Sequence, residues 1–269
     1  MALADFAAFK ALLARRGDVV NFHQLAVNHT DTGFNSTWTG FGGSAPSTAA
    51  ACTRATPGAI LPIYASASAW YAVEISAYRI GSTTPAMPMI LADRLSHQGG
   101  LSGTATSEQT TNLPTAALTR YTSGVGVMAA VEIYSNIGAT PQTVTINYTD
   151  QDGNAGQTSY AQDIGGGSND GARRMITMPL ADGDTGVRSV QGVTLSGSTG
   201  TAGDFGVTLY KPLIMFNAMS GREVRWSPFD SGWSMPEIND DACLYWVDFW
   251  GYTGQNVTVN SMLALSQVA

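Results

Sequence analysis

The chain has 269 residues, a net charge of −7 at pH 7 and only 12% charged residues. Basic side chains are too few to neutralise the phosphates of a nucleic acid, so we expect no nucleic-acid partner. The sequence contains no run of about eighteen apolar residues, and we therefore expect no membrane partner. Abundant glycine, threonine, serine and alanine, with 9% aromatic residues, are typical of a folded protein with a neutral surface.

The N-terminal residues lack a basic start followed by an apolar core, so we expect no signal peptide and synthesis in a cytoplasm. Residues 4–16 predict a short amphipathic helix with four apolar residues on one face. A helix of this length is marginal alone in water, so it must pack on something. It either packs on its own sheet or forms an arm that packs on a neighbouring subunit.

Residues 28–57 predict a long ordered loop or arm, because isolated aromatic residues interrupt a stretch of small polar ones. We expect residues 1–57 to form this N-terminal helix and arm, and residues 58–269 to form a β domain. Apolar anchors in the helix and arm are the candidate interface. These residues are Phe6, Phe9, Leu12, Leu13, Phe34, Trp38 and Phe41.

The middle of the chain predicts two β-hairpins. Apolar and polar residues alternate in 143–149, which is the period of a half-buried strand, and Asp152-Gly153 can turn the chain back into 157–161. Residues 192–196 and 206–210 are predicted to be the strands of the second hairpin, because a glycine-rich linker joins them.

Further strands are predicted at 69–80, 173–180 and 243–250. The last of these is almost continuously apolar, as expected for a strand buried on both faces. Pro85 and Pro88 limit the segment 87–95 to a sheet edge or a bulge. About ten strands at close spacing predict an all-β protein, a β-sandwich of the jelly-roll type.

No residue pattern indicates a metal site, a cofactor site or a catalytic centre. The histidines have no second ligand at metal-binding spacing, and Cys52 and Cys243 are expected to be two separate buried thiols. His97 near Ser102 is interpreted as a surface histidine and a turn serine, without a nucleophile motif around them. We therefore expect no enzyme activity.

Two weaker possibilities involve carboxylates. Glu74 and Glu132 both lie in predicted strands and could form the acid pair of a glycosidase if the fold brought them together. Residues 150–154 begin like a calcium loop but lack its glycine and its final glutamate, so a hairpin turn is the better interpretation. The C-terminal tryptophans could stack on sugars, or they could belong to the core.

Three blocks of sequence resemble structural proteins encoded in the virion gene clusters of tailed bacteriophages. The blocks run from Gly99-Gly-Leu-Ser-Gly-Thr104 through 110–124, from 184–195 through 205–209, and over 236–244. The similarity spans residues 60–265. The family has no catalytic motif to transfer to this chain.

The resemblance implies a capsid decoration or cement protein with a β-sandwich or jelly-roll core. Such a subunit is expected to form a homo-oligomer, a trimer, and to bind the major capsid protein on the outside of an icosahedral phage head. A host-carbohydrate-binding module of a tail or head fibre is the alternative.

Overall fold

The computed structural model describes residues 16–24, 33–60, 70–80, 86–114, 116–219, 221–227, 236–250 and 258–267. The all-β prediction is confirmed, and every strand pairing in the sheets is antiparallel. Among these residues the single helix is a short 3₁₀ turn, η1 (Trp38–Phe41). The predicted helix at 4–16 lies outside the described residues, except for Arg16, which is the first residue of β1.

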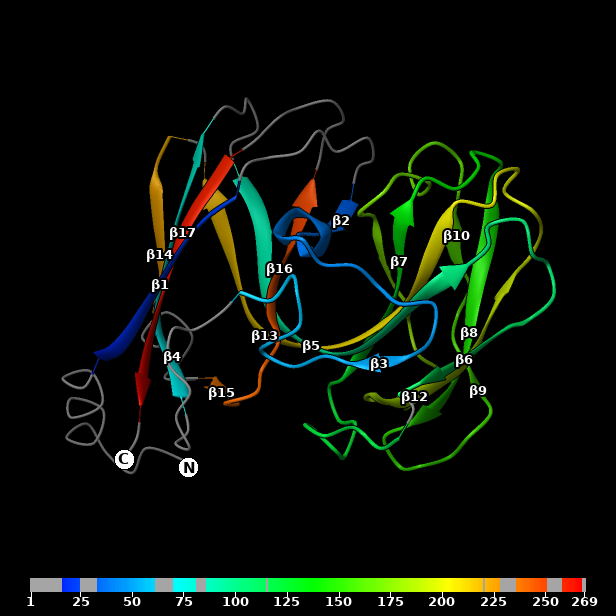
Figure 1. Ribbon diagram of the computed structural model, residues 1–269, viewed down its shortest axis with the longest axis horizontal. Helices are drawn as coiled ribbons and strands as arrows, with labels where there is room; N and C mark the ends of the chain where they lie inside the picture. Colours follow the sequence, from blue (N-terminus) through cyan, green and yellow to red (C-terminus); the bar gives the residue numbers. More distant parts are fainter. Residues whose placement is uncertain are drawn as a thin grey trace.

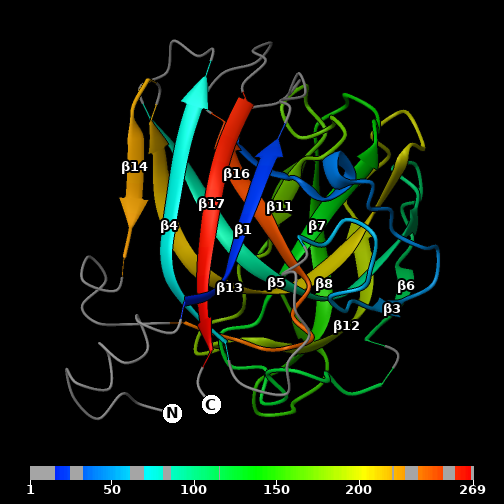
Figure 2. The same ribbon diagram turned by 60° about the vertical axis from the view of Figure 1, so that its left-hand side comes forward.

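A central sheet of seven strands forms the middle of the molecule (Figure 1). Its order is β11 (Met175–Thr177), β7 (Met128–Ser135), β13 (Asp204–Met219), β5 (Ala86–Leu101), β16 (Leu244–Trp250) and β2 (Gly33–Ser36), with β3 (Ala50–Ala51) also on β5. The sheet nearly closes on itself, because the Ser36 N–H donates to the Arg173 carbonyl at 2.9 Å and Asn35 forms a bridge with Arg174. We call it the barrel; Figure 2 shows β11 beside β7.

Two smaller sheets flank the barrel on opposite sides (Figure 1). The first contains β1 (Arg16–Gln24), β17 (Thr258–Gln267), β4 (Trp70–Ile80) and β14 (Glu223–Trp226), with β15 (Glu237–Ile238) paired to β4. The second contains β10 (Gln162–Ile164), β8 (Gln142–Asp150), β12 (Val187–Leu195) and β6 (Gln109–Leu113), with β9 (Gln157–Thr158) paired to β8. The jelly-roll prediction is not confirmed, since the described strands sort into three sheets rather than two.

Three apolar cores follow from this arrangement. One lies between the first flanking sheet and the barrel and includes Ile75 and Trp246; another lies between the second flanking sheet and the barrel and includes Ile146 and Leu209. The third, the barrel core, is built around Tyr245 and its neighbours. The strands β5 and β13 contribute to all three cores, because each is 16 residues long and passes through both halves of the molecule.

The first hairpin prediction is confirmed and the second is wrong. β8 pairs with β9, and Gly153 in the connecting turn has a φ of 91°, which glycine adopts without strain. The strands β12 and β13 both form, but they pair in different sheets. Their apolar residues face each other across one core, and the glycine-rich linker passes from sheet to sheet.

Two further strands show how burial outweighs local signals. β5 is a central strand and not an edge, although it contains Pro88; its pairing with β13 has register shifts in this segment, which fits the predicted alternative of a bulge. The proline is tolerated because β16 pairs with β5 only as far as Met89. β16 is buried on both faces, as predicted: Leu244 faces the first flanking sheet and Tyr245 faces the barrel core.

Candidate functional site

The barrel encloses a buried ion pair between Arg94 of β5 and Glu132 of β7. The Arg94 Nη2 atom lies 2.7 Å from Glu132 Oε2, and both side chains are fully buried. Thr208 and Tyr134 donate their hydroxyl groups to the same carboxylate oxygen, at 2.7 and 3.1 Å. Burial opposes the charge on both groups, but the ion pair outweighs it, so the pKa of Arg94 is raised and the pKa of Glu132 is lowered.

Aromatic rings enclose the Arg94 guanidinium. Its central carbon lies 4.4 Å from the centre of a Trp38 ring and 5.5 Å from that of Tyr245, as in a cation–π contact. Its Nε atom donates to His97 Nδ1 at 3.2 Å. The interpretation of His97 as a surface residue is therefore wrong, since only 2% of it is exposed. This polar cluster holds η1 and β5 together.

A second buried ion pair joins segments that are far apart in sequence. Arg120 donates to both carboxylate oxygens of Asp93, at 2.7 and 2.9 Å, and also to the carbonyls of Cys52 and Arg94. The Asp93 carboxylate accepts a further hydrogen bond from the Cys243 N–H at 2.9 Å. Planar, two-pronged pairing of this kind fixes geometry as well as charge. Arg120 thus connects three segments at one end of the barrel.

The carboxylates considered in the sequence do not assemble an active site. Glu74 belongs to β4 of a flanking sheet, whereas Glu132 is inside the barrel and paired with Arg94. Asp150 accepts hydrogen bonds from the backbone N–H groups of Asp152 and Asn154 and from the Asn154 side chain, as expected for a hairpin turn. No group of three or more potential metal ligands occurs within the described part of the chain.

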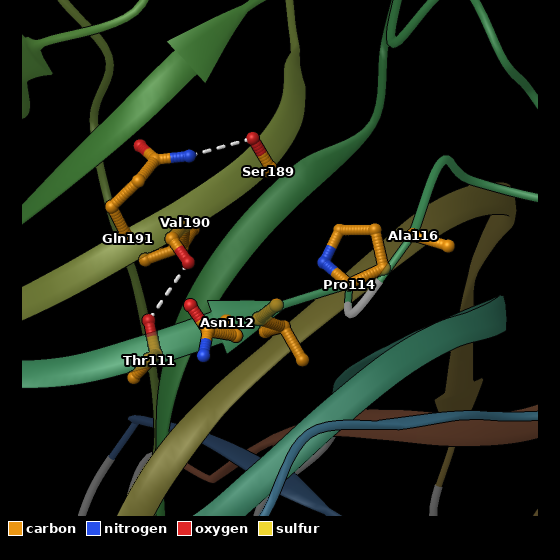
Figure 3. A pocket seen from close by; sticks show the side chains of 8 residues that line it. Thr111, Asn112, Pro114, Ala116, Ser189, Val190 and Gln191 are labelled. Carbon is orange, nitrogen blue, oxygen red and sulfur yellow. Dashed lines mark hydrogen bonds between the residues drawn. The ribbon is translucent and has the colours of Figure 1, made fainter.

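Two surface hollows are formed by described residues. The first, of about 370 Å³, lies between β6 and β12 and is lined by Asn112, Pro114 and Gln191 among others (Figure 3). Among its polar groups, Gln191 donates to Ser189 at 2.7 Å and Thr111 donates to the Val190 carbonyl at 2.8 Å. The second, of about 590 Å³, is more apolar and includes Met178. Neither hollow contains a charged cluster that would select a ligand.

An apolar row crosses four adjacent strands at one end of the barrel. Phe34 of β2 pairs with Phe249 of β16, and Ile90 of β5 pairs with Met215 of β13 and with Val247, two residues before Phe249. Directly paired residues share a face of a sheet, as do residues two apart on one strand, so all of them lie on the inner face of the barrel. Met215 is 69% exposed and Phe249 is 38% exposed. We call Phe34, Ile90, Met215 and Phe249 the apolar rim.

The predicted interface residues have different positions. Phe34 belongs to the apolar rim, where its ring lies 5.1 Å from that of Phe249. Trp38 is fully buried in the barrel core and offers no surface to a partner, and Phe41 is half-buried at the end of η1. Phe6, Phe9, Leu12 and Leu13 lie outside the described residues. β2, from the predicted arm, pairs with β16 from the predicted β domain.

Sequence reasoning missed Ile90 and Met215 because each belongs to a strand whose own pattern is unremarkable. Only the strand register places them beside Phe34 and Phe249. The rim can be recognised only when the pairing of the long strands β5 and β13 is known. The one available signal was an apolar residue at a position where an alternating strand should face solvent. Such residues are common on protein surfaces, so the signal is weak.

No protein-family model and no curated protein matches the chain. Among solved structures, it is similar to the VP2 subviral particle of infectious bursal disease virus, with 11% identity over 93% of this chain and 79% of that one, at a TM-score of 0.22. A structure of T=1 particles derived from the same virus gives 11% identity over 93% of this chain and 77% of the other, also at 0.22. A TM-score of this size is below what two proteins of one fold give. No helix in the described residues is long and apolar enough to cross a membrane.

Proposed function

We propose that the protein is a structural subunit of a tailed-phage virion, a decoration or cement protein without enzyme activity. In this proposal it forms a trimer and binds the major capsid protein on the outside of the head. The apolar rim is the observation that carries the proposal. A row of large apolar side chains on a rigid barrel is a surface suited to a protein partner, because exposed apolar patches mark interaction sites.

The sequence blocks that resemble phage virion proteins contact one another in the fold. This supports a similarity of fold between this chain and those proteins. The first block supplies Arg120, which lies 3.7 Å from Asp241 of the third block. Its strand β6 pairs with β12 of the second block, and the Thr111 hydroxyl donates to the Val190 carbonyl at 2.8 Å. The blocks thus correspond to connected parts of the fold and not to scattered surface segments.

The buried charges support a structural role in another way. Arg94 and Glu132 are paired with each other inside the barrel, and Arg120 is paired with Asp93. These groups order the fold, since each charge has a partner of opposite sign at hydrogen-bond distance. The fibre alternative depends on exposed tryptophan and tyrosine side chains, and Tyr160 is 54% exposed. The tryptophans whose burial the structure describes are all buried: Trp38, Trp70, Trp226 and Trp246.

Binding to phage heads tests the proposal. Purified protein should sediment as a trimer and should bind heads that lack their decoration layer until a fixed number of sites per head is filled. The double variant Met215→Ser/Phe249→Ser should lose most of its trimer formation, most of its binding to heads, or both. Its thermal melt should stay cooperative. Val125→Ser is the matched control, because Val125 is 52% exposed but lies outside the rim.

A monomer that fails to bind heads would refute the proposal. Binding that is unchanged in the double variant would leave a virion role possible but would remove the rim from it.

A further inference from the structure

Two short stretches of chain meet end to end along one edge of β5. β3 pairs there through Ala51 and Ser96, and β16 begins on the same edge with Leu244 opposite Asp93. The other edge of β5 is occupied throughout by β13. β3 and β16 therefore form one interrupted strand, with a break opposite residues 94 and 95.

Cys52 and Cys243 lie on the two sides of this break. The Cys52 N–H donates to the Leu95 carbonyl at 2.9 Å, and the Cys243 carbonyl accepts from the Arg94 N–H at 2.9 Å. Neighbouring carbonyl and N–H groups of β5 thus hold the two residues next to each other. Both side chains belong to the barrel core. Sequence separation hid this contact; the prediction that both thiols are buried is confirmed, and neither is in a disulfide.

We propose that Cys52 and Cys243 form a peroxide-sensitive dithiol that closes to a disulfide across the break between β3 and β16. The proposal is independent of the virion role. Its reactants are the two thiols and a small peroxide, which must reach two side chains that are fully buried. Ala51 beside Cys52 is exposed, and Asp241 near Cys243 is 51% exposed at its side chain.

The chemistry begins at Cys52. Burial opposes its ionisation, but the neighbouring Cys243 thiol, His97 and the charge of Arg94 outweigh burial, so the pKa of Cys52 is lowered. The pKa of Cys243 is raised, first by the neighbouring Cys52 thiol and then by burial. Ionisation is thus favoured at Cys52 over Cys243, and the thiolate is the nucleophilic form of cysteine.

The atoms balance over two steps. The Cys52 thiolate attacks hydrogen peroxide and breaks its O–O bond, which gives a sulfenic acid and, after protonation, one water. The Cys243 sulfur then attacks the Cys52 sulfur, the S–O bond breaks, and a second water leaves. Two thiols are oxidised by two electrons in total, and one peroxide is reduced to two waters. The new bond joins two residues that are 191 positions apart in sequence, so it closes a very long loop.

Thiol counting on the full chain tests the proposal. The untreated protein, unfolded in the presence of a thiol-blocking reagent, should carry two labels. After peroxide treatment of the folded protein it should carry none, and dithiothreitol should restore both. A non-reducing peptide map should contain a Cys52–Cys243 cross-linked peptide, and the oxidised protein should melt at a higher temperature than the reduced one.

Single-cysteine variants separate the steps. In Cys243→Ser the reaction should stop at the sulfenic acid of Cys52, which dimedone traps, whereas Cys52→Ser should give little dimedone adduct. If either variant fails to fold, the peptide map of the unchanged protein still decides. Two labels retained after peroxide treatment of the folded protein, or cross-links only between different chains, would overturn the proposal.

Discussion

At the scale of single residues, the barrel depends on charges that are buried in pairs. Replacing one member of such a pair leaves the other charged, buried and unpaired, and this is more costly than losing an ion pair at the surface. Arg94 has a second support in the Trp38 ring, but a ring face cannot replace a carboxylate.

Glu132→Gln should lower the free energy of unfolding by about 3–5 kcal/mol, since Arg94 would lose its counter-charge in a dry environment. Urea denaturation measures the change. Glu223→Gln is the matched control, because Glu223 pairs with Arg225 on the surface, where such a pair contributes about 0–1 kcal/mol. Equal effects of the two substitutions would contradict the assignment of Arg94–Glu132 as a core pair.

The same carboxylate predicts a pH dependence. Burial alone would raise the pKa of Glu132, but Arg94 and the donated hydrogen bonds hold it below its ordinary value in the folded state. The stability contributed by Glu132 is therefore complete above the unfolded-state pKa of about 4.3 and is lost as the pH falls through the folded-state pKa. Urea titrations from neutral to acid pH should show a shallower acid decline for Glu132→Gln than for the unchanged protein.

The sequence could indicate that Glu132 lies in a strand, but not that it is buried in a barrel. Its neighbours are Ala130 and Val131 on one side and Ile133 on the other, a pattern compatible with either face. The partner, Arg94, is 38 residues away, and its cage comes from Trp38 and Tyr245. Contacts of this range depend on the sheet register, which local periodicity does not determine.

At the scale of elements, β5 and β13 approach each other so closely that one position has no room for a side chain. A Cβ atom added at Gly206 of β13 would lie 1.7 Å from the carbonyl oxygen of Gln98 on β5. The backbones of these two central strands cannot move apart without breaking the hydrogen bonds between them. The glycine there is required by space and not by backbone conformation.

Gly206→Ala should therefore destabilise the protein by at least about 1–3 kcal/mol, the usual range for overpacking a core. Thermal denaturation checks this. Gly183→Ala provides the control: that glycine has a φ of 93° and open space around it, so only backbone strain of about 1–2 kcal/mol is expected. A smaller effect at Gly206 than at Gly183 would mean that the strands separate readily.

Element prediction succeeded where one face of a strand is buried and failed where partners had to be chosen. The alternation in β8 appears as buried Val144, Ile146 and Tyr148. The pairing of β12 with β13 failed, because a glycine-rich connection permits either a hairpin or a crossing between sheets. The core between the sheets decides, and it forms from residues along the whole chain.

At the scale of the whole molecule, the shared strands β5 and β13 make the two halves depend on each other. Each flanking sheet packs on a different part of β5 and β13. The cores on the two sides of the barrel therefore depend on the same two strands. We expect a single unfolding transition for the described part of the chain, in contrast to two domains joined by a linker.

Leu209→Ala tests this coupling. Leu209 is buried beneath the second flanking sheet, and its truncation should cost about 2–5 kcal/mol. The tryptophans of the opposite core, Trp70, Trp226 and Trp246, should report the same loss by fluorescence as circular dichroism does. Tyr160→Ala, at a 54% exposed position, should leave both signals unchanged. A fluorescence midpoint unaffected by Leu209→Ala would show that the halves unfold separately.

The length of β5 and β13 also determines how the protein bears a mechanical load. Sixteen residues of extended chain span roughly 50 Å, and the two strands are paired over almost all of that length. Because ladder hydrogen bonds run perpendicular to the strands, tension along the strand axis shears many bonds at once, whereas tension across it opens them one after another. A pull applied at the Met215 end and resisted at the Phe205 end would act along this stiff direction. The molecule should accordingly resist stretching between its two halves far better than peeling of either flanking sheet.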